Sequence, residues 1–213
     1  MIVIDGVDGS GKGVQSRRLL QALQANHIDS ILTREPGGSP AAEDIRKLLV
    51  EGDPEKWDSL TELLLMYAAR RAHLRDTIKP KLAAGIWVIS DRFADSSRAF
   101  QGIAGELGLD TVELIHRLVV ANFKPDLVLI LDLPVDIALQ RAEARGGKED
   151  RFEQKGEKYH QQVRSAFLQI AAGDKKQYEI INASDSIDQV TEAVFDVVNS
   201  RFQLNLTMQS LEK

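Results

Sequence analysis

The chain has 213 residues and a formal net charge of −5, and it contains no cysteine. The absence of cysteine excludes a disulfide scaffold, a thiol nucleophile and a cysteine-ligated metal site. The negative charge disfavours nucleic acid and anionic membrane surfaces, so we expect neither as a partner. No apolar run approaches the ~18 residues that span a bilayer, and the first residues form a predicted strand rather than a cleavable signal, so we expect a cytoplasmic location.

Five short apolar segments are predicted strands, and longer helical patterns separate them. The predicted strands are residues 2–4, 30–33, 86–90, 127–131 and 178–181. This alternation indicates an α/β fold, a five-stranded parallel sheet with helices on both faces. Ligands of such sheets bind beyond the carboxyl ends of the strands. We expect a single domain over residues 1–205 and a polar, frayed C-terminal tail over residues 206–213.

The glycine-rich segment after the first predicted strand carries the strongest functional signal. Residues 6–12, Gly-Val-Asp-Gly-Ser-Gly-Lys, fit the phosphate-binding pattern G-x-x-x-x-G-K, and a predicted helix over residues 14–25 follows. Such a loop wraps backbone N–H groups around phosphate oxygens, and Lys12 would reach the outer phosphates. Gly13 stands where the pattern usually has Ser or Thr, whose hydroxyl holds Mg²⁺ directly. Either water and carboxylates elsewhere hold the metal in this chain, or the pattern is degenerate. The residues predicted to bind ATP are Gly6, Val7, Asp8, Gly9, Ser10, Gly11, Lys12, Gly13 and Val14.

The segment after the second predicted strand, Arg34-Glu35-Pro36-Gly37-Gly38, combines a forced turn with adjacent opposite charges. A helix that begins near Asp58 then carries Arg70 and Arg71 after a run of apolar residues. Because an unpaired buried charge is costly, an arginine on the inner face of this helix needs an anionic partner. We expect this of Arg70, with Arg71 in solvent. The alternative is that both arginines are solvated.

Asp91 and Arg92 end the third predicted strand, on the side where the phosphate loop opens. An arginine there can bind a phosphate through two N–H groups, and a carboxylate can reach a metal or its water shell. The alternative is a structural salt bridge at the end of the strand.

A polar, glycine-containing segment over residues 146–150 predicts a small mobile lid, about residues 141–155. Arg141, Arg145 and Arg151 flank it, and such arginines can neutralise a transferring phosphoryl group. An ordinary charged surface is the alternative.

The four histidines show no metal-ligand spacing, so we expect them at the surface or on helix faces. They are His27, His73, His116 and His160.

Taken together, these segments resemble the thymidylate kinase family, which has a P-loop kinase fold. The resemblance runs from residue 1 to about residue 200 and rests on residues 6–12, Thr-Arg-Glu-Pro-Gly-Gly at 33–38, Asp-Arg-Phe at 91–93, 95–97, 99–102 and 145–151. It implies phosphoryl transfer from Mg·ATP to dTMP, giving dTDP and ADP, in dTTP biosynthesis. It also implies ATP and Mg²⁺ as cofactors and a homodimer packed through helices, with the predicted helix over residues 111–122 as a candidate contact.

The resemblance also implies roles for single residues. Asp8 resembles the carboxylate that contacts the acceptor's 3′-hydroxyl. Glu35 resembles the acidic residue near the metal and the acceptor, and Arg92 resembles the arginine that binds the acceptor phosphate. Because Gly9 and Ser10 leave the phosphate loop without arginine, the chain looks like the lid-arginine, bacterial-like type. The predicted catalytic residues are Lys12, Arg92, Asp8, Glu35, Arg145 and Arg151, with Asp91 reaching the metal through water.

The remaining implied roles concern the base and the sugar. Arg70 aligns with the arginine that bonds the base carbonyl, and Ser97 and Gln101 match polar positions near the base edge. Phe100 replaces a tyrosine near the deoxyribose, and Met66 replaces a phenylalanine that stacks on thymine. The predicted substrate-binding residues are Asp8, Glu35, Arg46, Met66, Arg70, Arg92, Ser97, Phe100 and Gln101.

Other functions remain open from the sequence. One is another nucleoside monophosphate kinase. A second is a deoxynucleoside kinase, whose neutral hydroxyl acceptor would need a base, with Glu35 or Asp91 as candidates. A third is a P-loop regulator that binds nucleotide without phosphoryl transfer. The polar residues expected at the acceptor site argue against the regulator, because they have little purpose without a second ligand.

Overall fold

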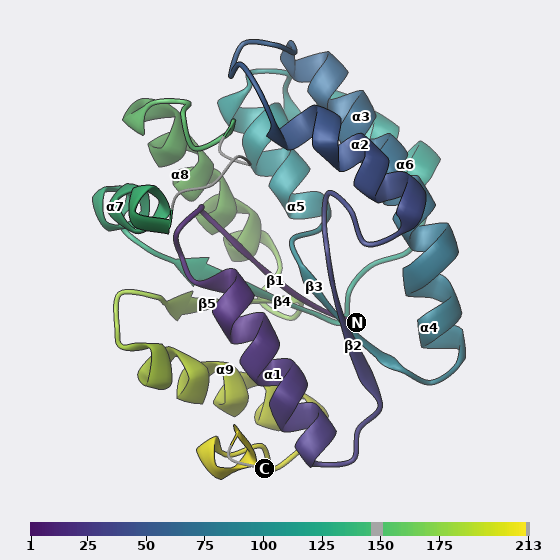
Figure 1. The fold of residues 1–213 in the computed structure, drawn as a ribbon, viewed down its shortest axis with the longest axis vertical. Coiled ribbons are helices and arrows are strands. Elements are labelled where there is room, and N and C mark those ends of the chain that lie inside the picture. Colours follow the sequence, from purple (N-terminus) through teal and green to yellow (C-terminus); the bar gives the residue numbers. More distant parts are fainter. Residues whose placement is uncertain (146–150, 212–213) are drawn as a thin grey trace.

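The computed structural model describes residues 1–145 and 151–211. Its strands form one parallel sheet in the order β2-β3-β1-β4-β5, which confirms the predicted α/β fold (Figure 1). The strands are β1 (Ile2–Gly6), β2 (Ser30–Arg34), β3 (Trp87–Asp91), β4 (Leu127–Asp132) and β5 (Tyr178–Asn182). Each lies where a strand was predicted and extends one or two residues further at its carboxyl end.

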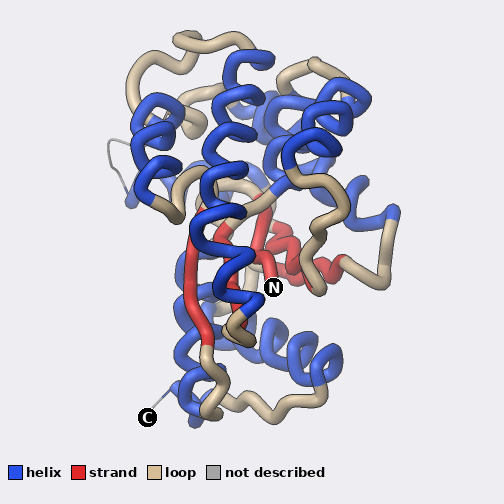
Figure 2. The backbone as a smooth tube through the Cα atoms, turned by 90° about the vertical axis from the view of Figure 1, so that its right-hand side faces the viewer, coloured by secondary structure: helices blue, strands red, loops and turns tan. Residues whose placement is uncertain are grey.

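Helices cover the sheet, and Figure 2 shows them packed around the central strands. They are α1 (Lys12–Ala25), α2 (Pro40–Val50), α3 (Ser59–His73), α4 (Lys79–Ala83), α5 (Ala94–Ser97), α6 (Leu109–Val119), α7 (Val135–Arg145), α8 (Glu157–Gly173) and α9 (Ile187–Phe202). Two π-helical segments, η1 (Leu74–Ile78) and η2 (Arg98–Ala104), continue α3 and α5, and a 3₁₀ helix, η3 (Met208–Leu211), lies near the C-terminus. Every residue of β1 is buried, as expected of a central parallel strand covered on both faces.

Two helix starts have clear local causes. The carboxylate of Asp58 accepts a hydrogen bond from the N–H of Thr61 at 2.7 Å, so α3 begins directly after it, as predicted. Ser186 and Gln189 form a capping box at the start of α9. None of the helices within residues 1–145 and 151–211 is long and apolar enough to cross a membrane.

The carboxyl ends of the strands bring distant residues to one edge of the sheet. Asp91 at the end of β3 is in register with Arg34 of β2 on one side and with Ile4 of β1 on the other. The phosphate loop leaves β1 at this same edge. The parallel register therefore gathers the ends of three strands around one space.

The C-terminal segment corrects a prediction. Leu206 is only 3% exposed, and the side-chain amide of Asn26, directly after α1, donates to the hydroxyl of Ser210 at 3.1 Å. The expectation of fraying was wrong for residues 206–211, because the apolar residues among them pack against the core beside α1.

Candidate active site

The loop between β1 and α1 has a backbone shape that glycine allows at two positions. Gly9 has φ 80°, and a Cβ there would lie 2.1 Å from the carbonyl oxygen of Ala138 in α7. Gly11 has φ 90°, precedes α1 without a side-chain cap, and has nothing within 4 Å of its Cβ position. The first turn of α1 holds no acidic residue, so its N–H groups and the helix dipole favour an anion in this open space.

Lys12 and Arg92 bring two cations to the loop, and Asp8 lies between them. Nζ of Lys12 donates to the carbonyl oxygen of Val7 at 2.7 Å and lies 3.9 Å from Oδ1 of Asp8. Nη2 of Arg92 donates to the same Asp8 oxygen at 2.6 Å. Burial, and then Arg92, lowers the pKa of Lys12 to about 8. Burial alone would raise the pKa of Asp8, but Arg92 and Lys12 outweigh it and hold that pKa below its usual range.

Asp5 in β1 fixes the other side of the Arg92 guanidinium. Nη1 of Arg92 donates to Oδ1 of Asp5 at 3.1 Å, to the carbonyl oxygen of Gly6 at 2.9 Å and to the hydroxyl of Ser96 at 3.1 Å. The guanidinium also lies 5.1 Å from the ring centroid of Phe100. Burial raises the pKa of Asp5 to about 6, although the charge of Arg92 opposes the shift. Arg92 is thus held in one orientation, with Asp8 as the partner nearest the open space.

Asp91 lies beside the first turn of α1 and fits a role near Mg²⁺. A Cβ built on Gly13 would lie 3.5 Å from Oδ2 of Asp91 and 3.4 Å from Nη1 of Arg17. No group of three His, Asp or Glu side chains forms a ready metal site within the described part of the chain. One carboxylate next to a phosphate loop suits Mg²⁺, which keeps several water ligands and takes others from substrate phosphates.

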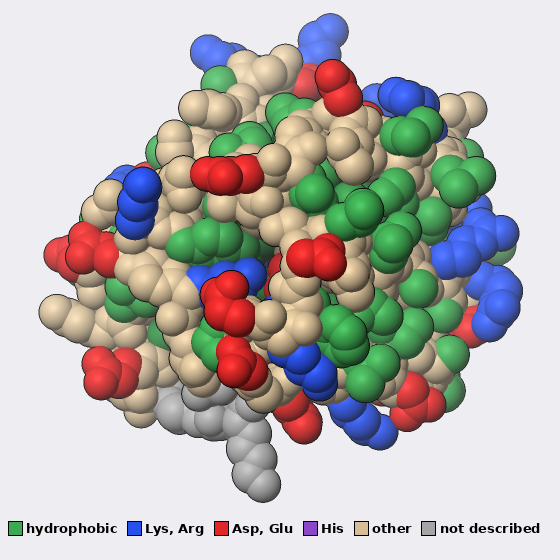
Figure 3. All heavy atoms as spheres, turned by 90° about the horizontal axis from the view of Figure 1, so that it is seen from above, with side chains coloured by type: hydrophobic (Ala, Val, Ile, Leu, Met, Phe, Trp, Pro, Cys, Tyr) green, Lys and Arg blue, Asp and Glu red, His purple; other side chains and the backbone are tan. Residues whose placement is uncertain are grey.

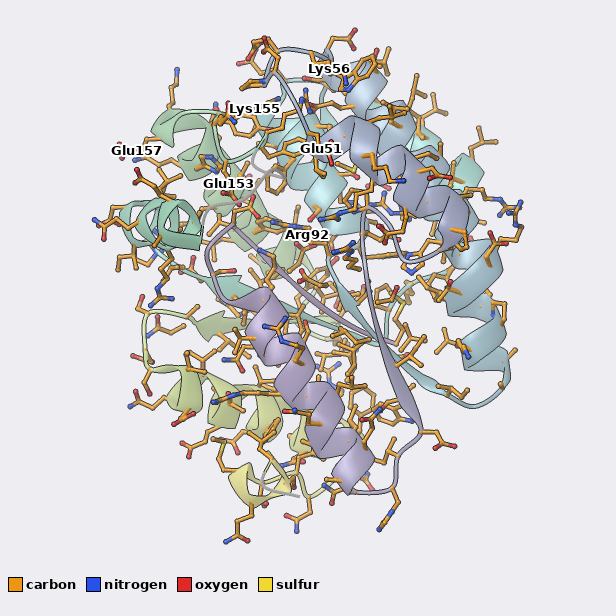
Figure 4. The ribbon with its side chains drawn as sticks, viewed as in Figure 1. Glu51, Lys56, Arg92, Glu153, Lys155 and Glu157 are labelled. Carbon is orange, nitrogen blue, oxygen red and sulfur yellow. The ribbon has the colours of Figure 1, made fainter. Side chains whose placement is uncertain are left out.

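A cavity of about 600 Å³ opens in front of the loop and reaches α3. Figure 3 shows a hollow with blue side chains inside it and red side chains around it. In Figure 4, Arg92 lies below Glu51, which follows α2, and below Glu153, which precedes α8. The predicted site residues that line the cavity are Asp8, Gly9, Gly11, Lys12, Gly13, Val14, Glu35, Arg46, Met66, Arg70, Asp91, Arg92, Ser97, Phe100 and Gln101. Gly6, Val7 and Ser10 lie in the buried base of the loop.

Arg70 and Glu35, which both line the cavity, form a buried ion pair. Nε of Arg70 donates to Oε2 of Glu35 at 2.6 Å, and the two residues are 2% and 5% exposed. Arg70 also donates to the hydroxyl of Ser97 at 3.1 Å and to the carbonyl oxygen of Phe93 at 2.9 Å. A guanidinium has five N–H groups, and the contacts among the described residues engage three of them. Arg71 is exposed, so the prediction of one buried, paired arginine is confirmed.

His73 contacts the second oxygen of Glu35. Its Nδ1 lies 3.0 Å from Oε1 of Glu35, and its Nε2 lies 2.6 Å from Oγ1 of Thr33. The histidines were expected at the surface or on helix faces, and His73 and His160 do lie on faces of α3 and α8, but these faces point into the protein and the two residues are 0% and 2% exposed. A signal was available, because His73 follows Arg70 by three residues and therefore shares its face of α3.

Arg151, predicted to act from the lid, does not line the cavity. It is fully buried and forms an ion pair with Glu62 of α3, with 2.5 Å between Nη1 and Oε2. Its N–H groups also donate to the carbonyl oxygens of Leu49, Asp53 and Pro54. These contacts fix the chain before α8 to the end of α2 and the connection that follows it, because each guanidinium nitrogen meets an oxygen.

The remaining lid predictions lie outside what the structure describes. The side chain of Arg145 and residues 146–150 are not among the described parts. Arg141 lines the cavity and donates to the carbonyl oxygen of Ala183 at 3.2 Å. Other lining residues that were not predicted as site residues are Arg17, Arg34, Pro36, Val50, Phe93, Ser96, Phe152 and Glu153. Several of these reach the cavity only through tertiary packing, so no local motif marks them.

The sheet order and the phosphate loop place the chain among proteins with the P-loop kinase fold. A sequence model of the family "Thymidylate kinase" matches residues 4–194. The thymidylate kinase of Caulobacter vibrioides is 48% identical to this chain, and the match covers 95% of this chain and 97% of the relative. The thymidylate kinase of Ruegeria pomeroyi is 46% identical, and that match covers 92% of this chain and 93% of the relative. The crystal structure of thymidylate kinase from Ehrlichia chaffeensis matches with a TM-score of 0.74 at 30% identity, over 92% of this chain and 97% of that one. The chain belongs to the thymidylate kinase family.

Proposed function

We propose that this chain transfers the γ-phosphoryl group of Mg·ATP to dTMP and releases dTDP and ADP. Family membership supports the activity. The observation that carries it is the cavity with two different ends, a cationic loop around Lys12 and Arg92 and a buried polar wall around Arg70 and Gln101. A nucleoside monophosphate has the matching pair of ends, a phosphate and a base.

In this proposal the loop and Lys12 bind the β- and γ-phosphates of ATP. Arg92 takes the acceptor phosphate, and the phosphate replaces Asp8 as one of its partners. Asp8 then becomes available to the sugar hydroxyl. Asp91 would hold Mg²⁺ through water, and the ion would supply charge neutralisation for the phosphoryl transfer. The acceptor oxygen is already ionised near neutral pH, so positioning and charge neutralisation suffice and no general base is needed.

Glu35 is poorly suited to the alternative role of a base for a neutral hydroxyl acceptor. Its two oxygens face Arg70 and His73, and it is 5% exposed. These contacts support a role in holding Arg70 against the base site instead. Roles in phosphoryl transfer for Arg145 and Arg151 stay predictions, and in the structure Arg151 contacts Glu62 rather than the loop.

The activity is tested by coupled ADP release with Mg·ATP and a panel of acceptors. The panel contains dTMP, dUMP, dCMP, dAMP, dGMP and thymidine. We expect dTMP to give the highest kcat/KM. Turnover of thymidine with none of dTMP would favour a deoxynucleoside kinase, and ATP binding without acceptor-dependent ADP release would favour a regulator.

We also propose a homodimer that packs through α3 and α6. Large apolar side chains are exposed on α2, α3 and α6, and Figure 3 shows hydrophobic side chains gathered on one side of the molecule. They are Leu48, Leu60, Leu64, Leu109, Leu114 and Leu118, and Leu118 is 84% exposed. An exposed apolar patch of this kind is typical of a protein contact. Light scattering is expected to give a dimer mass, and Leu118→Glu to shift it toward the monomer. A wild-type monomer at all concentrations would contradict the proposal.

A further inference from the structure

Gln101 lies at the wall of the cavity with one half of its side-chain amide already engaged. It belongs to η2, is 1% exposed, and lines the cavity. Its Nε2 donates to Oε1 of Glu62 at 3.3 Å. Within the described residues this is the one side-chain hydrogen bond of Gln101, so its Oε1 is left for a ligand.

A glutamine can present either a donor or an acceptor, because its amide can rotate by half a turn. The neighbour decides which end faces the cavity. A carboxylate only accepts hydrogen bonds, so Glu62 holds the NH₂ group of Gln101 and turns the carbonyl oxygen toward the ligand.

Glu62 is itself held in place from the other side. It is 1% exposed, and its Oε2 pairs with Arg151 at 2.5 Å and with Lys155 at 3.4 Å. Arg151 is in turn fixed by three backbone carbonyl groups. The two cations occupy Oε2, and Oε1 remains to accept from Gln101. The orientation of the amide is therefore set by a buried network that itself lies outside the cavity wall.

We propose that Glu62 is a specificity-determining positioning residue, which fixes the amide of Gln101 so that the base site offers a hydrogen-bond acceptor. This inference rests on the proposed function. Thymine carries a donor at N3–H, whereas cytosine carries a lone pair at N3. An acceptor at this place favours thymine and repels cytosine, and a freely rotating amide would serve both. Glu62 thus contributes to selection of the base without touching it.

The test is Glu62→Gln, which keeps the shape of the side chain but lets it donate as well as accept. We expect the ratio of kcat/KM for dTMP over dCMP to fall about tenfold, the scale of one oriented hydrogen bond. The KM for ATP is expected to stay unchanged, because Glu62 does not line the ATP loop. Where dCMP turns over too slowly, its Kd is measured by calorimetry.

The matched control is Lys155→Gln, which removes one cation from Glu62 but leaves an acceptor-only carboxylate beside Gln101. We expect its dTMP-to-dCMP ratio to stay within about twofold of wild type. An unchanged ratio in Glu62→Gln would overturn the inference. An equal fall in both variants would also overturn it, because loss of local charge would then explain the effect.

Glu62→Gln leaves Arg151 with a neutral partner, so thermal unfolding checks that the variant folds. If it does not, the double variant Glu62→Gln, Arg151→Met removes both charges, and the same fall in the ratio is expected. The wild-type acceptor panel keeps the two proposals apart. If wild type does not use dTMP, the proposed function fails; if it does and the ratio survives in the variants, only the role of Glu62 fails.

Discussion

The two ends of the cavity are built in different ways. The phosphate end comes mainly from one short loop, whose glycines, helix start and Lys12 are neighbours in sequence. The base end comes from ion pairs between distant segments, such as Glu35 with Arg70 and Glu62 with Arg151. The phosphate end is shaped to receive the negative charge of a ligand, while the charged side chains at the base end already balance one another. Changes at the phosphate end should therefore affect turnover, and changes at the base end should affect stability and selectivity.

The largest expected effect lies at the base end. Glu35→Ala leaves the buried guanidinium of Arg70 without its anionic partner, so we expect a loss of about 3–5 kcal/mol in the free energy of unfolding. Urea denaturation measures it. Asp44→Ala, which breaks the exposed pair with Lys47, is the control and should cost about 0–1 kcal/mol. Equal losses in the two variants would contradict the difference drawn between buried and exposed pairs.

At the phosphate end we expect a loss of turnover instead. Lys12→Ala and Arg92→Ala should each lower kcat by about 10² or more, the scale of one preorganised charge contact. Steady-state kinetics with dTMP and ATP measure this, and circular dichroism checks the fold. Arg71→Ala, at an exposed arginine of α3, should be near wild type. Near-wild-type rates in either of the first two variants would refute their assignment.

The lowered pKa of Lys12 predicts a pH dependence of ATP binding. Lys12 has a pKa of about 8 without ligand, and bound phosphates favour its charged form and raise that pKa. As pH rises through 8, the free protein loses the charge that ATP needs, so ATP affinity should fall about tenfold between pH 7 and pH 9. Calorimetry checks this in wild type and in Lys12→Met, which should bind weakly at both pH values with a flatter dependence. An ATP affinity of the wild type that does not change between pH 7 and pH 9 would show that Lys12 stays charged over this range.

The smallest expected effect concerns Gly13. Its Cβ position makes only ordinary contacts with Arg17 and Asp91, so a Cβ is accommodated there. In Gly13→Thr, a hydroxyl turned toward Asp91 would add a ligand near the metal, so we expect activity to be kept while the apparent affinity for Mg²⁺ tightens about a few-fold, the scale of one weak ligand. A Mg²⁺ titration of turnover measures it. An unchanged Mg²⁺ titration would show that the side chain at residue 13 does not contact the surroundings of the metal.

The difference between the two ends also explains which predictions succeeded. The strands, the helix after the phosphate loop and the helix after Asp58 were predicted because periodicity and caps are local signals. The burial of His73 and the pairing of Arg151 were missed, because each depends on an element distant in the sequence. The segment over residues 206–211 was misjudged as frayed for the same reason, since only the fold brings it against α1.

The sequence by itself determined the α/β class, the phosphate loop and the family, because these follow from residues whose spacing along the chain is their spacing in the structure. The tertiary structure decided how charge is distributed around the cavity. Parallel pairing brought Asp91 beside Arg34, and helix packing gave Glu62 both Arg151 and Gln101 as partners. Burial makes the pairings of Glu62 compulsory, since a charge or amide removed from water must find its partner in the protein.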